Sequence, residues 1–142
     1  MSFTHLNVSS AFSAHYGVTR PERLAIAAKS MGFDALAITD RDGLYGAVKH
    51  IGACVQLGIS PIIGVNLMVV DFGRVTILAH GQDKGKGWAG LCRIISAAQT
   101  GRGKQKNIAI ELKVLAELSA NCTILVGAGN IVSESVIINP QL

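Results

Sequence analysis

Apolar residues recur along this chain, in several segments, at the spacing of a single helix face. The first such segment opens at Pro21, a residue favoured in the first turn of a helix, and stops at Gly32. The second stops at Gly58, a residue type that commonly follows a helix. In the third segment, we expect Trp88 to pack in the core. The spacing predicts four helices, over residues from Pro21 to Met31, Leu44 to Val55, Trp88 to Ala98 and Ile110 to Leu118.

Short apolar runs rich in β-branched residues separate these helices and have the character of buried strands. Their alternation with the helices gives a mostly βαβα order, which is typical of parallel strands joined by helices in an α/β layer or barrel. Chemistry in such folds is expected where strands end and loops begin. The strands are expected at Phe3 to Val8, Ala35 to Thr39, Pro61 to Val70, Val75 to Ala79 and Thr123 to Val126.

The composition favours a single compact domain formed by residues 1–142. Of the 142 residues, 49% are hydrophobic and 15% are charged, which excludes a disordered or fibrous chain. The three cysteines are widely spaced and odd in number, so a disulfide framework is not expected. The N-terminus lacks a basic residue before Arg20, and we expect no export address and a cytoplasmic location.

One uncharged stretch, from Ile51 to Val70, has the length of a membrane-spanning helix. Gly58 and Pro61 interrupt it, and Asn66 would have to be buried in lipid. We therefore interpret this stretch as the end of one helix, a turn and a buried strand, and expect no membrane contact.

The net charge of +4 is concentrated in one segment. Between residues 84 and 106 there are six basic residues and no acidic one, a pattern that would attract phosphate groups. The alternative interpretation is a solvated loop and helix face, which is common for lysines flanked by glycine. The possible phosphate-binding residues are Lys84, Lys86, Arg93, Arg102, Lys104 and Lys106.

Polar residues follow several of the predicted strands, but by themselves they make a weak site. Only Asp40, with His5 and Asp42, has the chemistry of a metal ligand, and a hydrolytic metal centre needs several converging ligands. His5 alternates with apolar neighbours, a position more typical of a hydrogen-bonded core histidine than of a ligand. The polar segments are His5 to Ser10, Thr39 to Gly43, Gly64 to Asn66 and Gly127 to Asn130.

Several runs, in their order along the chain, resemble the polymerase and histidinol phosphatase (PHP) domain. They are most similar to the version that opens the α subunit of bacterial DNA polymerase III. This resemblance implies an irregular β/α barrel with parallel strands alternating with helices, of which these residues would form the N-terminal portion. The runs are Phe3–Ser10 with Phe12-Ser13 and Gly17, then Ala35–Asp40, Leu44–Val48 and Gly58–Gly64, followed by Thr76–Ala79 and Gly90–Ser96.

Active PHP domains hold a metal cluster with histidines and acids, and the resemblance implies that this chain has lost most of them. Asparagine and serine bind transition metals poorly, and an arginine places a positive charge where a cation would sit. We expect no metal, no cofactor and no catalytic residue, with Arg41 paired to Asp40 or to a neighbouring acid. Only Asp40 keeps its type among the positions implied, which are Asn7, Ser9, Tyr16, Asp40, Arg41, Asn66, Arg74 and Gly129.

The favoured function is a non-catalytic PHP module that supports a polymerase body or docks a replisome protein during DNA replication. The polymerase's own catalytic region is expected to be absent from these residues. Two alternatives stay open: a metal-dependent phosphoesterase or proofreading exonuclease, and a weak, sequence-independent nucleic-acid-binding module. A shortened barrel would also expose strand edges, so a homodimer is a further possibility.

Overall fold

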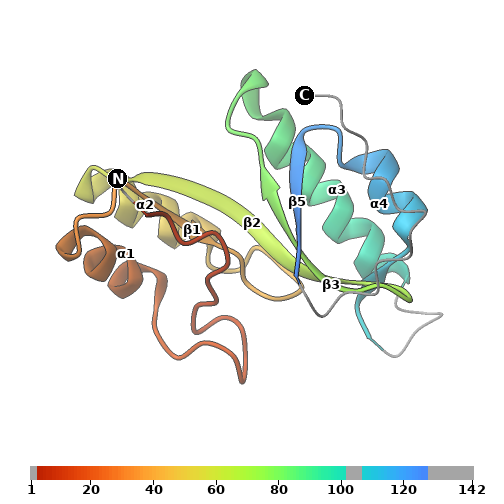
Figure 1. Ribbon diagram of the computed structural model, residues 1–142, viewed down its shortest axis with the longest axis horizontal. Helices are drawn as coiled ribbons and strands as arrows, with labels where there is room; N and C mark the ends of the chain where they lie inside the picture. The colour runs from red at the N-terminus through yellow and green to blue at the C-terminus, as the bar shows by residue number, and fades with distance from the viewer. Residues whose placement is uncertain (1–2, 102–106, 128–142) are drawn as a thin grey trace.

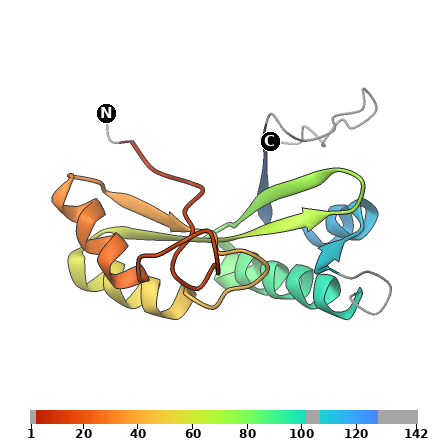
Figure 2. The ribbon, with the colours of Figure 1, turned by 90° about the horizontal axis from the view of Figure 1, so that it is seen from below.

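The computed structural model describes residues 3–101 and 107–127, and all structural statements concern these residues. They form an α/β structure in which α1, α2 and α3 lie on the same side of the strands (Figure 2). In chain order the elements are α1 (Pro21–Ser30), β1 (Ala35–Ile38), α2 (Ala47–Leu57), β2 (Ser60–Val69), β3 (Gly73–Ala79), the 3-10 turn η1 (Asp83–Gly85), α3 (Lys86–Thr100), β4 (Ala109–Ile110), α4 (Leu112–Leu118) and β5 (Cys122–Val126).

The long strand β2 joins the two halves of the molecule (Figure 1). Its first half pairs in parallel with β1, from Ser60 opposite Ala35 to Ile63 opposite Ile38. Its second half pairs antiparallel with β3 from Gly64 onward and in parallel with the short β4. Strand β5 adds to the far edge of β3, and the described sheet does not close on itself. The expected partial β/α barrel is therefore present as an open sheet.

The expected parallel direction holds for β1, β2 and β4, whereas β3 and β5 run antiparallel to their neighbours. Strands β2 and β3 are separated only by residues 70–72, and a parallel connection needs about a dozen residues or more. The chain therefore reverses in a tight turn, in which Asp71 and Gly73 both have positive φ angles. The residue types Asp71-Phe72-Gly73, which are typical of a tight turn, are the local signal in the sequence for this hairpin.

The segment from Phe3 to Val8, predicted as a strand, runs beside β1 without forming a regular ladder. Its carbonyl groups at His5 and Val8 accept hydrogen bonds from the N–H groups of Ala37 and Thr39, at 3.1 and 2.8 Å. The three-residue step from His5 to Val8 therefore lies opposite the two-residue step from Ala37 to Thr39, so the two segments do not keep a regular strand register. The Val8 N–H instead donates to the Thr39 hydroxyl, at 2.8 Å.

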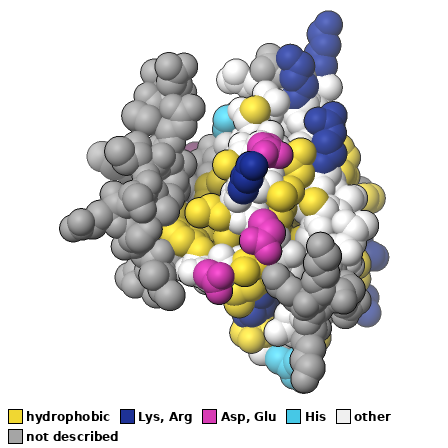
Figure 3. All heavy atoms as spheres, turned by 90° about the vertical axis from the view of Figure 1, so that its right-hand side faces the viewer, with side chains coloured by type: hydrophobic (Ala, Val, Ile, Leu, Met, Phe, Trp, Pro, Cys, Tyr) yellow, Lys and Arg dark blue, Asp and Glu magenta, His cyan; other side chains and the backbone are white. Residues whose placement is uncertain are grey.

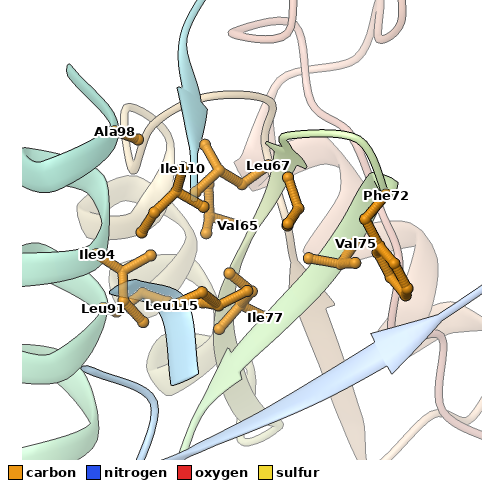
Figure 4. Close-up of a cluster of buried hydrophobic side chains, with 11 residues drawn as sticks. Val65, Leu67, Phe72, Val75, Ile77, Leu91, Ile94, Ala98, Ile110 and Leu115 are labelled. Atoms are coloured by element: carbon orange, nitrogen blue, oxygen red, sulfur yellow. The ribbon is translucent and has the colours of Figure 1, made fainter. Parts of the chain in front are cut away.

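The main hydrophobic core lies between the β2–β3 hairpin and α3, with contributions from β4 and α4 (Figure 4). Alternate residues of β2 point into it, as expected for a strand that is covered on one face. A second, smaller core packs α1 and α2 against β1. The buried members of the main core are Val65, Leu67, Val69, Phe72, Val75, Ile77, Leu91, Ile94, Ala98, Ile110 and Leu115.

The helices follow the predicted segments closely, with two corrections. Ile110 belongs to β4, so α4 begins only at Leu112. Trp88, expected in the core, is 41% exposed. Gly87 faces the interior instead, because a Cβ there would lie 2.3 Å from the His80 carbonyl oxygen, and the next residue along the helix is rotated outward.

In the described residues, no helix is long and apolar enough to cross a membrane. The uncharged stretch from Ile51 to Val70 divides, as interpreted, into the end of α2, a turn at Gly58 and strand β2. Gly58 has a φ of 66°, the left-handed conformation that glycine adopts most readily at the end of a helix.

Replacing Gly64 tests how tightly β2 is held between its neighbours. A Cβ at this position would lie 2.5 Å from the Ile77 carbonyl oxygen and 3.0 Å from Thr39 Cγ2. We expect Gly64→Ala to lower the free energy of unfolding by about 1–3 kcal/mol in urea denaturation. Gly52→Ala is the matched control, because a Cβ there meets nothing within 4 Å. An equal loss in both variants would contradict the crowding at Gly64.

The buried His50 of α2 predicts a pH-dependent stability. Its Nε2–H donates to the Leu36 carbonyl oxygen at 2.9 Å, and burial lowers the pKa of its imidazole, against smaller opposing effects of that hydrogen bond and of Asp40. Below about pH 6.5 the unfolded chain therefore binds a proton that the folded chain does not. We expect the unfolding free energy to fall as the pH drops from 7 to 5. His50→Gln should flatten this slope; an unchanged slope would remove His50 as its source.

Candidate functional site

The candidate site forms where the chain that follows β1 pairs with the middle of β2. The Asn66 N–H donates to the Asp40 carbonyl oxygen, and the Asp42 N–H donates to the Asn66 carbonyl oxygen, both at 3.0 Å. Arg41 and Asn66 thus form a parallel bridge between the loop after β1 and the middle of β2. Arg74 of β3 reaches the same place from the opposite side of the hairpin.

The Asp40 carboxylate is buried and accepts three hydrogen bonds. Its Oδ1 accepts from the Ser10 N–H and the Ser13 hydroxyl, both at 2.7 Å, and its Oδ2 accepts from the Ser10 hydroxyl at 2.9 Å. The residue is 1% exposed, and the two serines are also buried. A buried carboxylate is stable when donors surround it in this way. In this structure Asp40 fastens the N-terminal segment to the end of β1.

Arg74 joins Asn66 and Asp42 in one polar network. Its Nε donates to Asn66 Oδ1 at 2.6 Å, and its Nη2 donates to the Asn66 carbonyl oxygen at 2.7 Å. The same Nη2 forms an ion pair with Asp42 Oδ1 at 2.7 Å. Both side chains of the pair are largely covered, so this interaction is stronger than a typical surface ion pair.

Arg41 does not form the ion pair expected for it. Its guanidinium carbon lies 3.5 Å from the centroid of the Tyr16 ring, in a cation–π contact. Asp40 is unavailable, because the serines already occupy its oxygens and successive side chains of an extended chain point to opposite sides. Among the described residues, no carboxylate lies within ion-pair distance of Arg41.

The other positions implied by the resemblance contribute less. Asn7 is exposed, and its Oδ1 accepts a hydrogen bond from the Thr39 hydroxyl at 3.1 Å. Ser9 is half-buried, and Gly129 lies outside the described residues. His5, expected as a hydrogen-bonded core residue, is exposed and packs its ring against Phe3 and Phe33.

The site residues line a cleft of about 490 Å³. The sequence had singled out four of its lining residues, whereas its apolar wall was not anticipated. Ser10 and Ser13, which hold Asp40 beneath it, stood in the quoted motif but carried no signal of their role. The lining residues are Phe12, Ser13, Ala14, Tyr16, Arg41, Asp42, Met68, Arg74, Asn107 and Ile108.

Metal-binding chemistry does not fit this arrangement. Within residues 3–101 and 107–127, no group of three or more histidine, cysteine or acidic side chains is placed to hold a metal ion. Among the described residues, the one buried carboxylate, Asp40, already accepts three hydrogen bonds, and two guanidinium groups line the cleft beside it. A bound cation would meet positive charge and too few ligands.

The basic segment falls partly outside the described residues. Lys84 in η1, and Lys86 and Arg93 of α3, are exposed. Arg102, Lys104 and Lys106 lie outside the described residues. Figure 3 shows a group of Lys and Arg side chains at the upper right edge of one face, with acidic side chains nearer its centre. Charges of both signs are therefore present on this face.

Comparison with known proteins defines the class. The model of the PHP domain family matches residues 5–136, and the chain belongs to this family. A putative metal-dependent phosphoesterase from Bifidobacterium adolescentis has a similar fold, with a TM-score of 0.50 and 18% identity over 68% of this chain and 34% of that chain.

Two groups of bacterial polymerases are similar in sequence. The chain is 37% identical to the DNA polymerase III subunit alpha of Buchnera aphidicola subsp. Schizaphis graminum, over 88% of its own length and 11% of that protein. It is 40% identical to the error-prone DNA polymerase of Symbiobacterium thermophilum, over 72% of its own length and 9% of that protein. The chain thus spans about a tenth of the length of these relatives.

Replacing Asp40 by asparagine tests its structural role. The amide offers one acceptor where the carboxylate offers two, and its NH2 group faces hydrogen-bond donors. We expect Asp40→Asn to lower the free energy of unfolding by about 1–3 kcal/mol, with the same loss in the presence of EDTA. Asp34→Asn is the control, because Asp34 is exposed just before the same strand. A loss that EDTA abolishes would instead identify Asp40 as a metal ligand.

Proposed function

We propose that this chain is a non-catalytic, structural PHP module. One observation carries this proposal: the retained acid, Asp40, is buried under Ser10 and Ser13 and has become part of the scaffold. The arginines at the neighbouring positions give the cleft a positive charge in the place where the family resemblance implies metal ions. Hydrolysis of a phosphoester by the family's metal-dependent route has no support in this set of side chains.

We further propose that residues 1–142 form one domain of a larger polymerase-like body or a partner of it in DNA replication. The similarity to polymerase subunits supports this role. In such a body the module contributes surface and rigidity, while nucleotide addition belongs to other regions.

Two alternatives rest on narrower observations. The metal-dependent phosphoesterase or exonuclease is suggested by the family and by the named activity of the fold neighbour, whose identity of 18% supports the fold alone. Weak, sequence-independent DNA contact rests on the exposed Lys84, Lys86 and Arg93. We favour the structural module because the hydrogen bonds from Ser10 and Ser13 involve Asp40, the one acid that the family resemblance implies as a retained metal-site residue.

Metal content and hydrolysis together test the proposal. We expect the purified chain to retain substoichiometric zinc, manganese and magnesium after dialysis, by elemental analysis, and to leave p-nitrophenyl phosphate intact in added manganese. The matched control restores ligand types with Asn7→His, Ser9→His, Arg41→His and Asn66→Glu, and should bind more metal than the natural chain. Stoichiometric metal in the natural chain, together with hydrolysis abolished by Asp40→Ala, would overturn the structural role.

A further inference from the structure

The cleft described above, lined by residues from the strand ends, is called the strand-end cleft. Among its described lining residues, Arg41 is the charged group whose charge no ion pair compensates. Arg74, the other cation in the lining, is paired with Asp42 at 2.7 Å. In the described part of the chain, Arg41 is half-buried, and no side chain or carbonyl accepts a hydrogen bond from its guanidinium. The charged side chains that line the cleft therefore leave one net positive charge.

The contact with Tyr16 orients this guanidinium for recognition. One face of its plane stacks on the ring, which leaves the N–H groups along its edge free to donate. Two of these N–H groups can donate parallel hydrogen bonds to the two oxygens of one carboxylate. The stacking also limits the rotation of a long side chain, which reduces the entropy lost when a ligand binds.

The cleft wall is apolar and exposed. Phe12 is 42% exposed and Tyr16 is 63% exposed, and Met68 and Ile108 complete this side of the lining. Aromatic residues and arginine are enriched among the residues that contribute most to protein–protein binding. A ligand that fits the cleft combines a single anionic group with an apolar body.

We propose that this cleft docks a segment of a partner protein that presents an acidic side chain beside an apolar one. The carboxylate pairs with Arg41, and the apolar side chain packs against Phe12, Met68 and Ile108. This inference rests on the proposed structural function and locates its docking surface at the converted strand ends.

Charge favours a carboxylate over a phosphate group as the anion. A phosphate monoester carries close to two negative charges at neutral pH, whereas the described residues of the lining offer one uncompensated positive charge. The Asp42 carboxylate lies in the same lining and repels a second negative charge. A singly charged carboxylate matches the single charge of Arg41 and meets less of this repulsion than a phosphate monoester does.

Small probes test the recognition directly by NMR titration of the full chain in EDTA. The probes are 3-phenylpropionate, its neutral analogue 3-phenylpropanamide and phenyl phosphate. We expect 3-phenylpropionate to give saturable shifts of the backbone amides of Ser13, Arg41 and Asp42, with affinity at least about tenfold above that of the amide analogue. Phenyl phosphate should bind more weakly than the carboxylate.

Variants assign the effect to Arg41. Arg41→Gln should weaken 3-phenylpropionate binding at least about tenfold, and Arg41→Lys, which keeps the charge but lacks this pair of parallel N–H donors, should lie between. Arg93→Gln removes an exposed arginine on α3 and should change nothing. If Arg41→Gln misfolds, the comparison of Arg41→Lys with Arg93→Gln decides the case.

Three results would overturn the proposal: no saturable shift in the natural chain, undiminished binding in both Arg41 variants, or tighter binding of phenyl phosphate at the same amides. If one of these results occurs while the metal and hydrolysis assays are negative, the docking proposal is wrong and the proposed structural function still stands. Stoichiometric metal with hydrolysis removes the structural function itself, whatever the probes show.

Discussion

Strand β2 exchanges neighbours at Gly64, and the arrangement of the whole molecule depends on this exchange. Up to Ile63 the strand pairs with β1, and from Gly64 it pairs with β3. The missing side chain lets the Ile77 carbonyl and Thr39 approach β2 at the crossover. One continuous strand thereby connects the small core beneath α1 and α2 to the main core beneath α3.

The same exchange creates the strand-end cleft. Because β1 stops pairing as a strand at Ile38, its continuation through Asp42 crosses over Asn66 and meets the β3 side chain Arg74. Asp40 turns inward beneath the N-terminal segment, and Arg41 turns toward Tyr16. Two neighbouring charged residues thus have different surroundings. Asp40 is buried and holds the N-terminal segment, whereas Arg41 faces the cleft.

In this chain the backbone pairing at the strand ends does not depend on which side chains stand there. Backbone pairing between the loop after β1 and β2 needs no particular side chain at positions 41 and 66, so those side chains can change while the fold persists. The side chains present at these strand ends form a network of hydrogen bonds and an ion pair.

Sequence alone located the helices α1, α2 and α3 and the strands β1, β2 and β3, because the 3.6-residue period and the β-branched runs are local properties. It also identified the residues at the strand ends and, through a family resemblance, their shared position. Strand direction and the irregular pairing of residues 3–8 were decided by the short turn and by register. Which partner each charge takes was decided only by tertiary structure: Asp40 to the serines, Arg74 to Asp42 and Arg41 to Tyr16. Such pairings depend on burial and side-chain direction across segments 25 to 32 residues apart, which no local pattern encodes.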